Sequence, residues 1–427
     1  MVRFIPFVAV AAALPLFTEA FSPNVAKVVV ANSVQRQTHF QFPKESKTIS
    51  TSTSLDALTT TELPDKLYFK KETPKVLGGV KIGLRKLVVV TGASSGLGLN
   101  CAVKLAETGR HYVVMACRDV EKAKKVAKEM GMSEDSYTVM KLELGNLQSV
   151  RDFVANLKAF KSARPLTSLV CNAAVYRPTD PEPAFTDDGF EMSMGVNHLG
   201  HFLLCNLLLN DMSKAKNARM CIVGSITGNT NTVGGGLVYP QADLGDLKGL
   251  DAGGKQPITM ADGKPFFGAK AYKDSKVCNM MTVSELHNRY HDSTGIVFSS
   301  MYPGCIAETS LFREKRKWFR KGFPWFMKYV TGGYVGMEEA GERLAQVIDD
   351  PNCDKSNVYW SWNGGAKQVG RWSKDGKPKG AGGSGGEIFQ NDQSDAVRNP
   401  EMARRVWDAS ANCVGLTEND VPKAKRP

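Results

Sequence analysis

A tyrosine and a lysine four residues apart are the side chains in this sequence most suited to acid–base chemistry. Tyr272 and Lys276 lie in one short polar segment, and on a helix residues four apart share one face. An ordinary phenol has a pKa near ~10, and a neighbouring ammonium group favours the phenolate and lowers that pKa. We therefore expect Tyr272 to donate a proton at neutral pH, with Lys276 lowering its pKa.

A glycine-rich turn upstream supplies the second part of a reaction site. The apolar run Leu87–Val90 predicts a buried strand, and it leads directly into a turn that opens a predicted helix at Gly96. Glycines at such a turn let the backbone approach a pyrophosphate closely, and the helix N-terminus attracts the phosphate charge. The residues expected to bind a dinucleotide here are Thr91, Gly92, Ser94, Ser95, Gly96, Leu97 and Gly98.

Arg118 and Asp119, after the second predicted strand, decide which dinucleotide is expected. An acid at this place binds the free 2′-hydroxyl of NAD, whereas the planar fork of an arginine suits the 2′-phosphate of NADP. Arg118 favours NADPH, and Asp119 keeps NAD open. Two further contacts are expected at strand ends: Glu143 near the adenine, and Asn172 with Ala173 beside the turn.

The elements that must position these residues follow from the hydrophobic pattern. From Arg85 onward short apolar runs alternate with helical stretches, which predicts βαβ units and a parallel sheet. We expect one large α/β domain over residues 66–427, a doubly wound Rossmann-type sheet flanked by helices. The predicted strands are Leu87–Val90, Tyr112–Ala116, Tyr137–Leu144, Leu166–Ala174, Met220–Gly224, Gly295–Met301 and Val358–Trp362. The predicted helices include Gly96–Thr108, Val120–Met130, Ser149–Phe160, Leu199–Leu209, the helix of Tyr272, and Met402–Val414.

Composition restricts the class of partner. The chain has 427 residues, a formal net charge of +12 and 42% hydrophobic residues. The positive charge suits an anionic cofactor or a membrane surface, and without zinc-finger spacing or an RNA-binding signature we expect no nucleic-acid partner. Nine cysteines occur with no Cys-x-x-Cys pair, which indicates free thiols in a reducing compartment.

The N-terminus carries targeting signals. Arg3, the apolar run 4–17 and Ala20 predict a signal peptide over residues 1–20, and the Ser/Thr-rich stretch 21–65 predicts a transit peptide with a linker. The combination resembles the bipartite plastid presequence of algae with secondary plastids. A plastid stroma would agree with unpaired cysteines, and an ordinary secreted protein is the alternative.

Four polar side chains, Asn197, Ser225, Tyr272 and Lys276, complete a pattern that begins at the glycine turn. Together with Asn172–Ala174 and the Pro303-Gly304 pair, they make the chain resemble the short-chain dehydrogenase/reductase superfamily. The resemblance implies that Tyr272 donates a proton and that Lys276 lowers its pKa and holds the nicotinamide ribose. It further implies that Ser225 positions the substrate or Tyr272, that Asn197 holds a water linked to Lys276, and that Pro303 and Gly304 lie near the nicotinamide.

Ser225 and Tyr272 are 47 residues apart, a gap that places an insertion at residues 229–268. A long insertion of this kind is either disordered or a lid for a large ligand. With the insertion, the segments 268–280, 302–307 and 358–363 make residues 85–415 resemble the light-dependent protochlorophyllide oxidoreductases.

This second resemblance implies a reaction. NADPH would give a hydride and the enzyme a proton to the D-ring double bond of protochlorophyllide once the bound pigment absorbs light. The residues that the resemblance places against the pigment are Tyr302, Cys305 and Thr309, with Cys305 an alternative proton source, and Cys278 is a further candidate. The alternatives are a dark short-chain reductase of a lipid-like carbonyl, and a non-catalytic pigment- or nucleotide-binding scaffold.

A stretch rich in Lys, Arg and aromatic residues, 310–334, suggests a lid or an interfacial segment. Gly322 and Pro324 interrupt any long helix there, so the stretch does not predict a transmembrane span. Its aromatics would face the pigment, or its cations would contact anionic plastid lipids. The second reading implies peripheral membrane association on the stromal side. Self-association into a homo-oligomer stays open.

Overall fold

The computed structural model describes residues 85–229, 238–306, 333–364 and 382–423, together with 76–77, 80–81, 236, 325 and 327–331. Residues from Lys71 onward form one compact unit. The predicted presequence, Thr309 and most of the segment 310–334 lie outside the described residues. Within the described part of the chain, no helix is long and apolar enough to cross a membrane.

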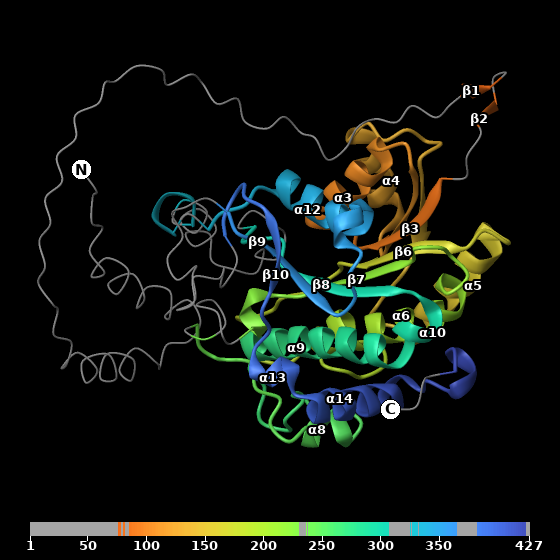
Figure 1. Ribbon diagram of the computed structural model, residues 1–427. Helices are drawn as coiled ribbons and strands as arrows, with labels where there is room; N and C mark the ends of the chain where they lie inside the picture. Colours follow the sequence, from red (N-terminus) through yellow and green to blue (C-terminus); the bar gives the residue numbers. More distant parts are fainter. Residues whose placement is uncertain are drawn as a thin grey trace, which may run out of the picture. The chain divides into compact units, whose positions relative to one another are not determined.

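An eight-stranded sheet forms the centre of the described fold (Figure 1). Its order is β10-β9-β8-β7-β6-β3-β4-β5, with every pair parallel except the antiparallel pair of β10 and β9. The strands are β3 (Lys86–Thr91), β4 (His111–Cys117), β5 (Tyr137–Lys141), β6 (Leu166–Cys171), β7 (Arg219–Val223), β8 (Val297–Met301), β9 (Val358–Trp362) and β10 (Ile388–Asn391). The chain starts at β3, winds out to β5 and returns through β6 in the opposite direction. This confirms the predicted doubly wound α/β fold.

Burial on both faces explains why the central strands read as continuous apolar runs. Every residue of β7, β8 and β9 is buried, as expected for parallel strands covered by helices on both sides. The predicted strand 166–174 ends earlier, at Cys171, because the N–H groups of Asn172 and Ala173 turn to the Thr91 hydroxyl instead of the ladder.

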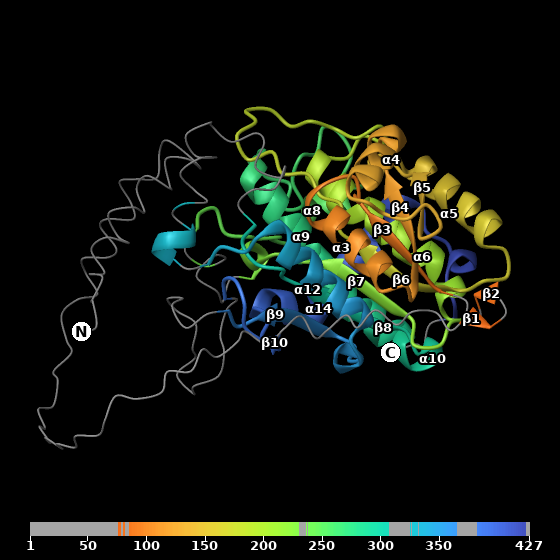
Figure 2. The same cartoon turned by 90° about the horizontal axis from the view of Figure 1, so that it is seen from above.

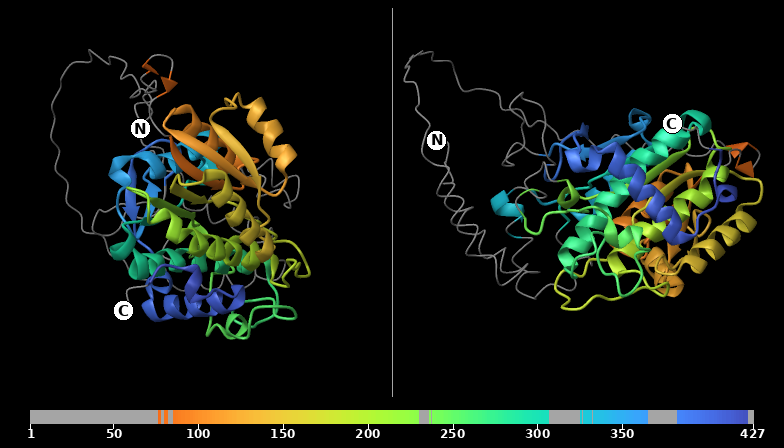
Figure 3. Two further views of the ribbon diagram at one scale, coloured as in Figure 1. Left: turned by 90° about the vertical axis from the view of Figure 1, so that its right-hand side faces the viewer. Right: turned by 90° about the horizontal axis from the view of Figure 1, so that it is seen from below.

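Two helical layers cover the sheet. On one face lie α3 (Gly96–Glu107), α4 (Val120–Glu129) and α12 (Met337–Asp349), and Figure 2 shows α12 beside α3. On the other face lie α5 (Leu147–Lys161), α6 (Gly200–Met212) and α9 (Gly268–Leu286). The C-terminal helix α14 (Pro400–Val414) packs on the outer side of α9 (Figure 3). The sequence pattern had not predicted α12.

The contact between α3 and α12 is close enough to require a glycine. A Cβ atom at Gly341 of α12 would lie 2.3 Å from the Asn100 Cβ of α3 and 2.7 Å from its carbonyl carbon. Salt bridges from Lys104 to Glu338 (3.0 Å) and Glu342 (3.1 Å) flank this contact. The start of α12 is thereby held beside the glycine turn that opens α3.

The described part of the insertion, 238–268, lies on the side of α9 that faces away from the sheet. It contains the short helix α8 (Lys248–Asp251), which packs against α14. The Lys273 ammonium donates to the carbonyls of Val238 and Pro240 at 2.6 Å each, and the Asp274 carboxylate accepts from the Asp243 N–H at 2.9 Å. These residues are therefore ordered, because buried charges of α9 hold them, and the expectation of a lid for a large ligand stays a prediction.

We predict that Gly341→Ala destabilises the protein although alanine normally favours a helix by about 1 kcal/mol over glycine. The added methyl meets the backbone of α3, and overpacking of this kind costs about 1–3 kcal/mol. The thermal midpoint, measured by differential scanning fluorimetry, should fall by several degrees. Gly336→Ser is the control, because Gly336 is the N-cap of α12 and has no atom within 4 Å of an added Cβ. An unchanged midpoint for Gly341→Ala would contradict the close contact.

Candidate active site

The glycine turn after β3 is shaped by contacts that leave room for hydrogen only. A Cβ at Gly92, whose φ is +67°, would lie 2.9 Å from Ala173. One at Gly98 would lie 2.4 Å from the Asn172 amide nitrogen and 2.7 Å from the Gly92 carbonyl oxygen. Asn172 donates in turn to the Thr91 carbonyl at 2.9 Å. The predicted residues at the ends of β3 and β6 thus lie together.

Thr91 joins this turn to the helices beneath it. Its hydroxyl oxygen accepts the N–H groups of Asn172 (2.9 Å) and Ala173 (3.0 Å) and lies 2.9 Å from His201 Nε2. Because His201 Nδ1 faces the Asn197 carbonyl at 3.0 Å, Nδ1 carries the proton and Thr91 donates to Nε2. Burial lowers the pKa of His201 to about 3 and that of His198 to about 4. Both histidines are buried and hydrogen-bonded within the fold.

The first turn of α3 fits a phosphate group. The Ser95 side chain makes no capping hydrogen bond, so the first N–H groups of α3 keep their donor capacity. Residues 94–97 are half-buried, and a Cβ at Gly96 would find only the Met337 sulfur, at 4.0 Å. A helix N-terminus with free donors and an open approach is the environment that binds a dinucleotide pyrophosphate.

At the end of β4 the Arg118 side chain is exposed, whereas the Asp119 side chain is used within the fold. The Arg118 guanidinium is 78% exposed and lies 3.6 Å from the Glu143 carboxylate. The Asp119 carboxylate is occupied, since it caps α4 by accepting the Lys122 N–H at 2.9 Å. Glu143 also accepts the Gly145 N–H at 3.1 Å. Arg118 is therefore an exposed cation whose ion pair with Glu143 is long, and the acid that kept NAD open is engaged in helix capping.

The four polar residues of the predicted constellation lie close together at the carboxyl end of the sheet. Ser225 follows β7; its hydroxyl lies 2.8 Å from the Thr227 hydroxyl and close enough to the Tyr272 phenol to lower its pKa. The Lys276 ammonium donates to the Val223 carbonyl at 2.9 Å and lies 5.9 Å from the centre of the Tyr272 ring. Tyr272 and Lys276 are 8% and 2% exposed.

Asn197 connects this group to the loop after β6. It lies in the π-helical turn 194–199, which precedes α6. Its amide accepts the Val175 N–H at 2.8 Å and donates to the Ser275 hydroxyl of α9 at 3.1 Å. A single π-turn of this kind is frequent at functional sites, and here it allows Asn197 to bridge two elements.

The structure corrects the expected titration of Tyr272. Burial raises the pKa of Tyr272 to about 12, and Ser225 is the group that lowers it. Lys276 does not act as predicted, because burial also disfavours its own charge and lowers the pKa of Lys276 to about 8. Desolvation therefore outweighs the attraction between ammonium and phenolate, and Tyr272 is a neutral hydroxyl at physiological pH.

The Pro-Gly turn after β8 lies beside this site. Gly304 has a φ of +115°, and a Cβ there would lie 2.3 Å from Val335. The Pro303 carbonyl accepts from the buried guanidinium of Arg343 at 2.8 Å. Burial raises the pKa of the Cys305 thiol to about 12, so Cys305 is a neutral thiol. Tyr302 is half-buried between Cys305 and Tyr272.

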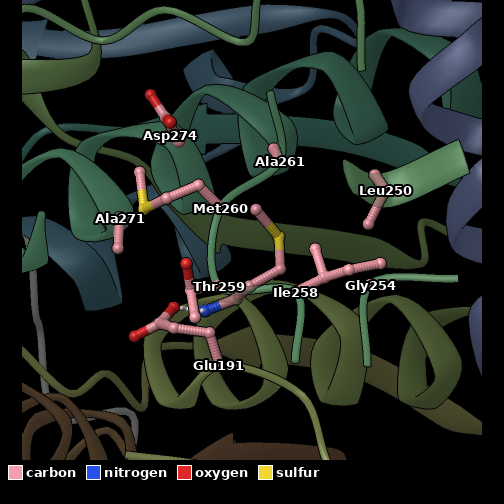
Figure 4. Close-up of a pocket in the computed structure, with 10 residues that line it drawn as sticks. Glu191, Leu250, Gly254, Ile258, Thr259, Met260, Ala261, Ala271 and Asp274 are labelled. Atoms are coloured by element: carbon pink, nitrogen blue, oxygen red, sulfur yellow. Dashed lines mark hydrogen bonds between the residues drawn. The ribbon is translucent and has the colours of Figure 1, made fainter. Parts of the chain in front are cut away.

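Cys278 does not belong to this group. It follows Lys276 by two residues, about 200° around the helix, and it is fully buried in the core on the side of Asp274. A small pocket lies on that side between α9 and the insertion (Figure 4). Ala271 and Asp274 line it, whereas Tyr272 does not. The contact of Cys278 with substrate stays a prediction, and the structure places its side chain in the core.

Sequence reasoning missed three residues around Tyr272. The ring of Tyr176 lies 4.6 Å from that of Tyr272, centre to centre. Arg343 donates to Pro303, Glu339, Gly383 and Gly385, and thereby ties α12 to two loops. Tyr359 of β9 lies within electrostatic range of Tyr272. Segment 171–176 and strand 358–362 were recognised as motifs, but nothing in the sequence pointed to these side chains.

We predict that the buried Lys276 makes stability depend on pH. Its folded pKa of about 8 lies below the ordinary value of 10.5, so the unfolded chain binds more protons between pH 8 and 10.5. Wild-type stability relative to Lys276→Met should therefore rise across that window, by about 3 kcal/mol at most. Thermal midpoints of both proteins at pH 7, 8, 9 and 10 measure this, and parallel curves would show that Lys276 keeps its ordinary pKa.

Comparison with known proteins agrees with this geometry. The family model described as short chain dehydrogenase matches residues 86–242. A solved structure of a 3-ketoacyl-(acyl-carrier-protein) reductase from Brucella melitensis, complexed with NADH, is 21% identical, covers 64% of this chain and 95% of its own, and has a TM-score of 0.46.

Curated relatives are much more similar. Protochlorophyllide reductase B, chloroplastic, of Oryza sativa subsp. japonica is 52% identical over 352 residues, 82% of this chain and 82% of the relative. The chloroplastic protochlorophyllide reductase of Chlamydomonas reinhardtii is 54% identical over 78% and 79% of the two chains. Protochlorophyllide reductase A, chloroplastic, of Arabidopsis thaliana is 54% identical over 77% and 76%. With such identity over more than two thirds of each relative, the chain belongs to the protochlorophyllide reductase family of short-chain dehydrogenases.

Proposed function

We propose that this protein reduces the D-ring double bond of protochlorophyllide to give chlorophyllide, with NADPH as cofactor and light as the trigger. The observation that carries the proposal is the meeting of Ser225, Tyr272 and Lys276 beside the glycine turn and the Pro303 turn. The chain that holds them is 52–54% identical to protochlorophyllide reductases.

Each residue has a role in the proposed reaction. When bound, the nicotinamide cofactor supplies a hydride to one carbon of the double bond. Tyr272 gives its phenolic proton to the other carbon, so two C–H bonds form as the π bond is lost. A phenol that burial keeps protonated is suited to this step. The phenolate left behind would be stabilised by the Ser225 hydroxyl and by Lys276, which must then turn from the Val223 carbonyl.

Cys305 is the alternative donor for the same proton. Its pKa of about 12 makes it a neutral thiol, comparable in acidity with Tyr272 in this environment. Tyr302, and Thr309 outside the described residues, would line the pigment pocket with it. Asn197 is bonded to Val175 and Ser275, and its proposed role is to hold the loop after β6 against α9.

NADPH is favoured over NADH by the exposed positive charge at the end of β4. Arg118 is exposed and offers a planar fork that suits a 2′-phosphate. Asp119, the residue suited to a 2′-hydroxyl, is occupied as the cap of α4. We propose that Thr91, Gly92, Ser94, Ser95, Gly96, Leu97, Gly98, Glu143, Asn172, Ala173, Pro303 and Gly304 complete the cofactor site.

We place this function in the plastid stroma, because the relatives are chloroplastic proteins and the N-terminal stretch reads as a plastid presequence. Trp325 and Tyr329 are 60% and 65% exposed, with Lys328 beside Tyr329. Exposed aromatics next to a cation are suited to the surface of an anionic membrane, which supports peripheral membrane association of this segment.

The reaction is tested by mixing the protein with NADPH and protochlorophyllide in darkness, giving a light flash and recording the absorption spectrum. We expect chlorophyllide only after the flash. Loss of the donor in Tyr272→Phe should lower the yield by about 10²-fold or more, and Cys305→Ser should lower it less. The matched control is Tyr112→Phe, whose hydroxyl bonds the Tyr137 carbonyl far from the site. Turnover of a carbonyl compound in darkness would indicate the short-chain reductase alternative, and binding without turnover the scaffold.

Cofactor choice is tested at Arg118. Loss of a charge-assisted hydrogen bond costs about 1.5–3 kcal/mol, so Arg118→Ala should bind NADPH about 10-fold to 100-fold more weakly and leave NADH binding unchanged. Arg118→Lys keeps the positive charge but lacks the planar guanidinium, so its affinity for NADPH should lie between those of wild type and Arg118→Ala. Dissociation constants from nicotinamide fluorescence measure these effects. Equal binding of both cofactors by wild type and Arg118→Ala would remove Arg118 from the site.

A further inference from the structure

Tyr359 carries a buried hydroxyl for which the described residues provide no hydrogen-bond partner. The side chain is 2% exposed, and its oxygen has no hydrogen-bond partner among the described residues. A hydroxyl taken out of water without a partner lowers stability, and folded proteins contain few such groups. A group that breaks this rule needs an explanation, and beside a reaction site a bound ligand supplies one.

The position of Tyr359 places its ring below the reaction site. β9 runs parallel to β8, so that Tyr359 lies opposite Ser300, two residues before Tyr302. A Cβ at Gly224, the residue before Ser225, would lie 3.2 Å from the Tyr359 ring and 3.4 Å from Met280 of α9. The ring therefore lies on the α9 side of the sheet, at the level where β7 and β8 end.

The Tyr359 hydroxyl shares one electrostatic environment with two other phenols. Burial raises the pKa of Tyr359 well above the ordinary value, and the nearby Tyr272 raises it further. Burial likewise raises the pKa of Tyr302, to which Cys305 and Tyr359 add. Tyr359 thus stays protonated at physiological pH and offers an O–H donor.

The neighbouring acceptors are already used. The Ser300 hydroxyl donates to the Ile222 carbonyl at 2.9 Å, and the Trp360 carbonyl accepts the Tyr302 N–H at 2.9 Å. No described residue bonds the phenol, which lies in electrostatic range of Tyr272, and this leaves a molecule that enters the site as the candidate acceptor for Tyr359.

We propose that Tyr359 is a ligand-binding residue whose hydroxyl donates a hydrogen bond to a carbonyl-type oxygen of a bound molecule beside Tyr272. This inference rests on the proposed function and deepens it. Two sources of such an oxygen enter the site, the carboxamide of the nicotinamide and the carbonyl or carboxylate groups of the pigment. Tyr359 would fix the reacting molecule relative to the proton of Tyr272.

Tyr359→Phe removes only the hydroxyl and tests the inference with three measurements on the same protein. The thermal midpoint without ligands should be equal to or higher than that of wild type, because an unpaired buried group has been removed. The dissociation constants of NADPH and of protochlorophyllide, measured separately, should show that one of them binds about threefold to tenfold more weakly. Weaker NADPH binding assigns the carboxamide, and weaker pigment binding assigns the pigment oxygen.

Tyr112→Phe is the matched control, because its hydroxyl bonds the Tyr137 carbonyl at 3.0 Å. It should show the opposite pattern, a lower thermal midpoint with unchanged binding of both ligands. A lower midpoint for Tyr359→Phe, or unchanged binding of both ligands, would overturn the proposal. If wild type itself fails to reduce the pigment, the proposed function fails, and the NADPH measurement still decides the role of Tyr359.

Discussion

The rest of this structure depends on the burial of α9, a helix that is polar and yet covered on almost every side. Nearly all of its residues are buried, including Lys273, Asp274, Ser275 and Lys276. A buried polar group must be paired or it destabilises the fold. On the sheet side the partners are Asn197 and the Val223 carbonyl. On the outer side they are backbone groups of the insertion. The same constraint thus positions the candidate site and anchors the insertion.

Burial also decides the chemistry of the Tyr272–Lys276 pair. Two groups four residues apart in water would attract as phenolate and ammonium, but both are taken out of water here, and burial makes each charged form harder to reach. The two pKa values therefore move apart, the phenol rising from 10.0 to about 12 and the ammonium falling from 10.5 to about 8. Tyr272 is therefore a neutral phenol that keeps its proton until the reaction takes it, which suits a residue that donates one proton per reaction.

Prediction from the sequence succeeded where one local rule acts alone. The strand into Gly92 and the helix from Gly96 follow from apolar runs and from glycines at a turn. It failed where distant elements compete. Cys278 is close in sequence to Lys276, and only the structure shows that its side chain lies in the core. Helix α12, which carries Arg343, was not predicted. Its role beside the site depends on its packing against α3, and the sequence of the helix alone does not show that packing.

What the sequence by itself determined is the order of strands and helices, the glycine turn, and the identity of the residues at the carboxyl ends of the strands. These features depend on residue type and short spacing, which chain geometry converts directly into local structure. What only the tertiary structure decided is the state of those residues. Burial lowers the pKa of Lys276, Asp119 becomes a helix cap, and Tyr359 has a hydroxyl that pairs with none of the described residues. Each of these outcomes depends on desolvation and on partners far away in the chain, which no local pattern contains.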